Sequence, residues 1–175
     1  MPYSDGSFSG RVLAGSFFRD IVWQLLEDSG YTVLPYGYEV TVPYVRQRLG
    51  IGSSKSKVMD RFRSSPDLLV IDEAKDELNL VEVKWRNWNR PYVDSEFLQL
   101  SKYKKYWPEA VLVLLVPSGY YFYAQRVSKL KPGRGHYRLA TSFKRIDRFF
   151  PKITKASTKN FQSAIDLYVG AYFSR

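Results

Sequence analysis

Asp67, Glu82 and Lys84, near the middle of the chain, combine two carboxylates with an ammonium group. Asp67 follows Pro66 and opens a short apolar run, whereas Glu82 and Lys84 stand two residues apart in an alternating segment. Two carboxylates brought close together repel each other unless a cation lies between them, and hard oxygen ligands suit Mg²⁺ or Mn²⁺. An ammonium group beside such an ion can hold a water molecule or stabilise charge that develops on a phosphate.

The segments that carry these residues are predicted to form a β-hairpin. Residues 68–71 are a short apolar run and residues 79–86 alternate, so both favour strands. The period of two places the second carboxylate and the ammonium on one face of their strand. Residues 72–77 are too charged to be buried and are predicted to form the hairpin tip, in water. Such a hairpin would bring Asp67 near Glu82.

The order Pro66-Asp67, fourteen residues, then Glu82-Val83-Lys84 resembles the core motif of the PD-(D/E)xK nuclease superfamily. The resemblance implies an α/β fold with a restriction-endonuclease-like core, in which a mixed β-sheet is flanked by helices on both faces. It further implies that Asp67, Glu82 and the Val83 carbonyl hold Mg²⁺ (or Mn²⁺), that Lys84 orients the attacking water, and that products carry 5′-phosphates. The structural alternative is an Asp67 that only turns the chain, with a solvent-facing Glu82–Lys84 pair.

Gln99 and Tyr103 lie four residues apart, hence on one face of the next predicted helix, which Asp94 or Ser95 would cap. Their spacing resembles the Gln-x-x-x-Tyr element that follows the Glu-x-Lys strand in RecB-type members of the superfamily. In that resemblance both side chains lie beside the metal and contact the substrate or support Lys84. The alternative is a Tyr packed against the sheet and a solvated Gln.

An earlier amphipathic helix is predicted from residue 15 to residue 28, before Ser29-Gly30. Members of the superfamily often carry a Glu on this helix, but here Arg19 occupies the corresponding position. Asp20 is next along the chain, about 100° around the helix. Either Asp20 completes the metal site through a shifted register, or the metal keeps another water.

Basic residues are concentrated late in the chain. Eleven lie between residues 126 and 159 against one acid; subtracting them from totals of 27 basic and 17 acidic residues leaves sixteen of each elsewhere. Such a segment suggests a polyanionic partner, here DNA, although a solvated basic surface is the alternative. A basic segment before the hairpin is predicted to be a mobile loop that closes on a phosphate backbone, or an ordinary polar connection. The candidate nucleic-acid-binding residues are Arg46, Arg48, Lys55, Lys57, Arg61, Lys102, Arg134 and Arg138.

The 175 residues are predicted to form a single domain with a basic C-terminal extension from about residue 126. Absence of cysteine excludes disulfides, thiolate zinc sites and iron–sulfur clusters. No signal peptide or apolar run long enough for a bilayer is present, so we expect a soluble cytoplasmic protein without a membrane partner.

Further elements are expected along the chain. They are an extended stretch at 38–45, a buried strand at 110–116, an outermost strand at 120–126, and a flexible loop or hairpin tip at 131–137 with a surface His136. A final amphipathic helix is expected at 160–172, with an apolar face made of Phe161, Ala164, Ile165, Leu167, Tyr168 and Tyr172.

These features predict a metal-dependent deoxyribonuclease. The Gln99–Tyr103 element favours processing of ends or single strands, although the absent cysteines argue against the cluster-bearing RecB-like branch. The short chain, first helix and loop at 52–54 are similar to archaeal Holliday-junction resolvases, which implies cleavage of branched DNA and a possible homodimer. One rival is a catalytically inactive DNA-binding or assembly protein, supported by Arg19. Another is an RNA-binding or RNA-processing protein, supported only by charge and aromatic content.

Overall fold

The computed structural model describes residues 8–37, 57–86, 91–94, 98, 100–117, 120–131 and 135–173. Its elements, in chain order, are α1 (Phe8–Asp28), β1 (Thr32–Pro35), α4 (Lys57–Arg63), β2 (Leu68–Asp72), β3 (Glu77–Trp85), β4 (Tyr92–Asp94), α5 (Leu100–Tyr106), β5 (Val111–Leu115), β6 (Phe122–Arg126), η1 (Val127–Lys129), β7 (His136–Arg138), α6 (Leu139–Ser142), β8 (Lys144–Arg145), η2 (Ile146–Arg148) and α7 (Lys155–Phe173).

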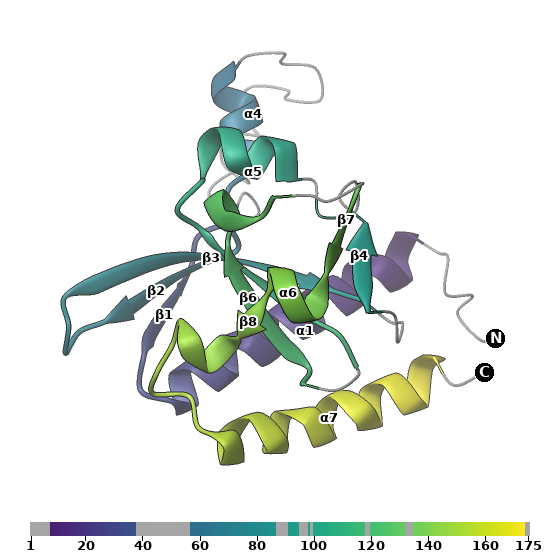
Figure 1. The fold of residues 1–175 in the computed structure, drawn as a ribbon. Coiled ribbons are helices and arrows are strands. Elements are labelled where there is room, and N and C mark those ends of the chain that lie inside the picture. The colour runs from purple at the N-terminus through teal and green to yellow at the C-terminus, as the bar shows by residue number, and fades with distance from the viewer. Residues whose placement is uncertain are drawn as a thin grey trace.

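A six-stranded sheet in the order β1-β2-β3-β5-β6-β8 forms the centre of the molecule (Figure 1). The sheet is mixed, because β3 and β5 run parallel while its other neighbouring strands are antiparallel. A second sheet joins β4 to β7. Within the described residues, no helix is long and apolar enough to cross a membrane.

Hydrophobic side chains pack against both faces of the large sheet. Every residue of β5 is buried, as the apolar run predicts, and alternate residues face opposite ways. Val111 and Val113 join a core beneath α1 and α7, whereas Leu112 and Leu114 join a core with residues of α5, α6, β4 and β7. Helices therefore cover both faces, and the predicted α/β class with a flanked mixed sheet is confirmed.

Helix α1 supports the strand that carries the candidate site. Its buried stripe includes Phe18, Val22 and Leu25, each 0% exposed, and the helix ends before Gly30, whose φ of 84° suits glycine. Phe18 stacks on Trp85 of β3 with ring centroids 4.3 Å apart. The helix begins at Phe8, earlier than the sequence predicts.

Helix α7 runs beside α1 on the same face of the sheet (Figure 1). Tyr168 stacks on Phe17 with ring centroids 3.8 Å apart, and Ile165 is buried. The predicted apolar face is wrong at Leu167, which is 77% exposed, and at Ala164, which is also exposed. The helix starts at Lys155, five residues before the predicted boundary.

The segment around β4 and β7 differs from expectation at two residues. Asp94 lies in β4, which excludes it as the helix cap, whereas Ser95, the other predicted cap, lies outside the described residues. His136 lies in β7 rather than in a loop, and it is the register partner of Asp94. Strands of three residues are too short to show a periodicity, and their pairing joins distant parts of the chain. Likewise β6 is not outermost, because the two-residue strand β8 pairs beyond it.

The segment before the hairpin also differs from its prediction where it is described. Residues 57–63 form helix α4 instead of a loop. The expected extended stretch at 38–45 lies outside the described residues.

The hairpin forms as predicted, but its tip is shorter than expected. Asp72 belongs to β2, pairs in register with Glu77 and is 3% exposed, so the expectation that it faces water is wrong. Lys152 supplies the reason, because its Nζ lies 2.8 Å from Asp72 Oδ1. This cation comes from far along the chain, and no local pattern indicates the contact.

Candidate active site

Asp67 and Glu82 meet across the β2–β3 pair. Leu68 is the register partner of Val81, so extending the ladder by one residue sets Asp67 opposite Glu82. The Val83 N–H donates to Asp67 Oδ2 at 2.8 Å, which fixes the carboxyl group. On the other side, the N–H groups of Tyr36 and Gly37 donate to the Asp67 carbonyl, which ties the residue to the end of β1.

Glu82 is held by two donors on one oxygen. Tyr103 of α5 donates its hydroxyl to Glu82 Oε1 at 2.6 Å, and Lys84 Nζ lies 2.6 Å from the same oxygen. The ammonium group of Lys84 also lies 5.6 Å from the centroid of the Tyr103 ring. The solvent-facing alternative for Glu82 is excluded, because this side chain is 2% exposed.

The helix α5 positions Tyr103 for this contact. Leu100 and Tyr103 form its buried face and pack in the core between the helix and the sheet. Tyr103 therefore both packs against the sheet and belongs to the site, because its ring lies in the core while its hydroxyl reaches Glu82. Gln99 lies outside the described residues.

The surroundings of Asp67 disfavour the charged form of its carboxyl group. Burial, followed by the negative charge of Glu82, raises the pKa of Asp67 to about 8. The Val83 N–H, Lys84 and Arg19 act in the opposite direction without cancelling this effect. Without a cation in the site, Asp67 is therefore mostly protonated at neutral pH.

Lys84 and Tyr103 both stay protonated at neutral pH. Burial opposes the charge on Lys84, but the charge of Glu82, its hydrogen bond and the charge of Asp67 together raise the pKa of Lys84. Burial, then the charge and hydrogen bond of Glu82, raise the pKa of Tyr103 well above its usual range. Both side chains are donors here, and neither is suited to accept a proton.

The donor set of this site fits a hard divalent cation. Glu82 Oε2 is buried and has no hydrogen-bond partner among the described residues, and an orphaned carboxylate oxygen is costly unless a cation meets it. The mutual repulsion of Asp67 and Glu82 also favours a bound cation between them. In the described ranges, no three His, Asp or Glu side chains form a cluster able to bind metal by themselves, so backbone or water oxygens would have to complete the coordination.

Arg19 contributes a positive charge to the site in place of an acid. Its guanidinium acts electrostatically on Asp67 and lowers the pKa of that group. It also contacts Ser16 Oγ at 3.2 Å, and its Nε lies 3.5 Å from Asp20 Oδ1. Asp20, whose side chain is 63% exposed, faces Arg19 and joins no cluster of potential metal ligands among the described residues.

The candidate nucleic-acid-binding residues are only partly within the described structure. Arg46, Arg48, Lys55 and Arg134 lie outside it. Lys57 and Arg61 lie on α4, and the Arg61 guanidinium is 4.9 Å from the Trp107 ring centroid. Lys102 is exposed on α5, and Arg138 is exposed in β7.

One group of cations is missing from the sequence-based candidates. Lys144, Arg145 and Arg148 line a single pocket beside β8, together with Tyr123. The density of basic residues after residue 126 is the signal that could have found them. What the sequence does not show is which of the eleven basic residues face one another.

The sequence matches no protein-family model and no curated protein. The fold is similar to the solved structure of Hjc, a Holliday junction resolvase from the archaeal hyperthermophile Archaeoglobus fulgidus. The TM-score is 0.48 at 13% sequence identity, covering 81% of this chain and 99% of that chain.

Proposed function

We propose that this chain is a Mg²⁺- or Mn²⁺-dependent nuclease that hydrolyses phosphodiester bonds in DNA on a restriction-endonuclease-like core. One observation carries the proposal. Glu82 is clamped through one oxygen by Tyr103 and Lys84, while its second oxygen is buried without a described partner opposite Asp67. A carboxylate held in this way is oriented for a cation rather than for solvent.

The proposed roles follow from these contacts. Asp67, Glu82 and the Val83 carbonyl would hold the ion, which when bound supplies Lewis acidity and a more acidic water. Lys84, a cation at neutral pH, donates to the attacking water or to a phosphate oxygen. Tyr103 keeps Glu82 in position, and Gln99 is proposed to contact the substrate or support Lys84.

The described structure also gives specific support to a second candidate, a DNA-binding or assembly protein without catalytic activity. Arg19 stands where an acid would be expected, and Lys84 neutralises Glu82 directly. An ion would have to compete with both cations. This candidate predicts DNA binding that does not depend on divalent metal.

Cleavage of a substrate panel separates the two candidates. Labelled single-stranded, duplex, flapped and four-way-junction DNA would be incubated with the wild-type protein in Mg²⁺, Mn²⁺ or EDTA. We expect metal-dependent cutting, with the preferred substrate choosing between end processing and branched-DNA cleavage. Tight binding in EDTA with no cutting under either metal would instead support the non-catalytic candidate.

The panel also tests the remaining proposals about the partner. RNA of the same sequence serves as a competitor, and we expect it to compete more weakly than DNA. Preference for a four-way junction would favour a homodimer, because such a substrate presents two equivalent strands for cutting. Sedimentation of the protein–DNA complex measures that stoichiometry.

A further inference from the structure

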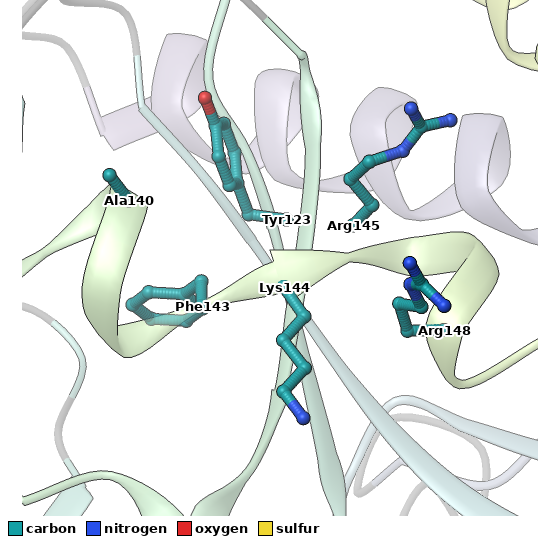
Figure 2. Close-up of a pocket in the computed structure, with 6 residues that line it drawn as sticks. All are labelled: Tyr123, Ala140, Phe143, Lys144, Arg145 and Arg148. Carbon is teal, nitrogen blue, oxygen red and sulfur yellow. The ribbon is translucent and has the colours of Figure 1, made fainter.

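The open pocket beside β8 has a chemistry distinct from that of the candidate active site. It has a volume of about 510 Å³ and is lined by Lys144, Arg145, Arg148, Tyr123, Phe143 and Ala140, with no acidic residue (Figure 2). Phe143 is buried and forms an apolar wall, whereas Tyr123 is half-buried. Three cations beside two aromatic rings are typical of a surface that binds phosphates and sugar or base rings.

Two of the three cations have charges that the described protein does not neutralise. Arg145 is already paired, since its guanidinium lies 2.8 Å from Asp147 Oδ2 and 4.0 Å from the Tyr120 ring centroid. Lys144 and Arg148 are exposed and have no ion pair with any described residue. Arg145 thus already has partners in the protein, while Lys144 and Arg148 are available to an anion.

The sheet register relates this pocket to the candidate active site. Lys84 is the partner of Leu114, Leu114 of Tyr123, and Tyr123 of Arg145, so one row of residues crosses four strands. Three strand spacings amount to about 14 Å. That length corresponds to about four phosphate steps along a duplex.

We propose that Lys144 and Arg148 form a second DNA-backbone site, separate from the candidate active site at Asp67 and Glu82. The choice of DNA rests on the proposed function. The exposed, cationic character of the pocket suits a passing polyanion better than an enclosed small ligand. Tyr123 provides a ring against which a sugar or an unpaired base packs.

The test is DNA binding by the full chain in EDTA, so that it does not depend on cleavage. Anisotropy would measure the affinity of a labelled duplex of about twenty base pairs, well beyond the four-step span, across a series of salt concentrations. The variant is Lys144→Ala with Arg148→Ala, which leaves the Arg145 contacts intact. The matched control is Lys129→Ala with Lys155→Ala, because both residues are exposed and the charge change is equal.

We expect the pocket variant to weaken binding by about tenfold at low salt and to reduce the slope of log affinity against log salt by about two. The control should lose much less. If the wild type cleaves DNA, the pocket variant should raise KM at nearly unchanged kcat.

Three outcomes would overturn the proposal. The first is a pocket variant whose DNA affinity and salt slope equal those of the wild type. The second is a control variant that loses as much affinity as the pocket variant. The third is duplex RNA of the same sequence that binds the wild type as tightly as DNA does and loses as much affinity in the pocket variant. Wild-type DNA binding in EDTA together with no cleavage in either Mg²⁺ or Mn²⁺ would contradict the proposed nuclease function while leaving the pocket test intact. Circular dichroism melting establishes that both variants are folded.

Discussion

At the scale of single residues, the neutral form of Asp67 links the candidate site to the stability of the protein. The folded-state pKa of about 8 lies above the ordinary value of 3.8, because burial and Glu82 disfavour the charge. The folded protein therefore binds this proton more tightly than the unfolded chain. The resulting stabilisation is complete below about pH 4 and is lost as the pH rises toward 8.

Asp67→Asn should remove that dependence in metal-free protein. The amide oxygen still accepts the Val83 N–H, and the side chain stays neutral at every pH. In EDTA we expect the variant to match the wild type near pH 4 and to exceed its stability by a margin that grows up to about pH 8. Denaturant unfolding across this range measures the difference. Parallel profiles of stability against pH for the two proteins would show that the pKa of Asp67 is not raised in the folded protein.

Local spacing was sufficient to find the residues that meet in this site. The period of two in β3 puts Glu82 and Lys84 on one face, and the Pro-Asp start of the hairpin brings Asp67 opposite. The contact between Tyr103 and Glu82 depends in addition on helix α5 packing against the sheet. The influence of Arg19 on Asp67 was not predictable, since it depends on how α1 crosses the strands.

At the scale of elements, Lys152 joins the segment before α7 to the β1–β2 pair. Its Nζ contacts Asp72 Oδ1 at 2.8 Å and the Gly30 carbonyl at 3.0 Å. Its ammonium lies 4.7 Å from the centroid of the Tyr31 ring. The hydrogen bond from Lys152 is the main cause of a lowered pKa at Asp72.

Lys152→Met should lower the midpoint of thermal unfolding at neutral pH, because a buried carboxylate loses its counter-charge. A lowered folded-state pKa gives stability that is present above the ordinary value of 3.8 and is lost as the pH falls through the folded value. The gap between wild type and variant should therefore shrink below about pH 4. Lys155→Met, at an exposed position, is the control. An equal effect from this control would contradict a stabilising role for the Lys152–Asp72 ion pair.

The elements that sequence patterns missed are short or paired over long distances. Strands β4 and β7 have three residues each and pair Asp94 with His136. Neither has enough length for a periodic signal. By contrast, β5 and α1 are long and apolar enough to specify their burial directly.

At the scale of the whole molecule, we propose that the basic C-terminal segment is part of one domain with the nuclease-like core. Tyr137 and Phe143 contribute to one hydrophobic core, and Ile165 contributes to the other. Sequence composition indicates only the charge of this segment. Which side chains of this segment are buried depends on which of them face the sheet.

Substitutions within α7 test this single-domain proposal. Ile165→Ala should destabilise the whole protein by about 2–5 kcal/mol, because the side chain is 1% exposed. Leu167→Ala, at a position 77% exposed, should have little effect. We expect a single unfolding transition that shifts only in the first variant. A separate low-temperature transition for α7 would argue for an independent C-terminal unit.

The most direct test of the proposed nuclease site is the Mg²⁺-dependent cleavage rate of the preferred DNA substrate by wild type and Glu82→Gln. The amide still occupies the same volume and accepts from Tyr103, but it removes the charge that a cation needs. We predict that cutting is abolished while the fold and DNA affinity in EDTA are preserved. Cleavage by the folded variant at the wild-type rate would contradict the assignment of Glu82 to metal binding and of this site to phosphodiester hydrolysis.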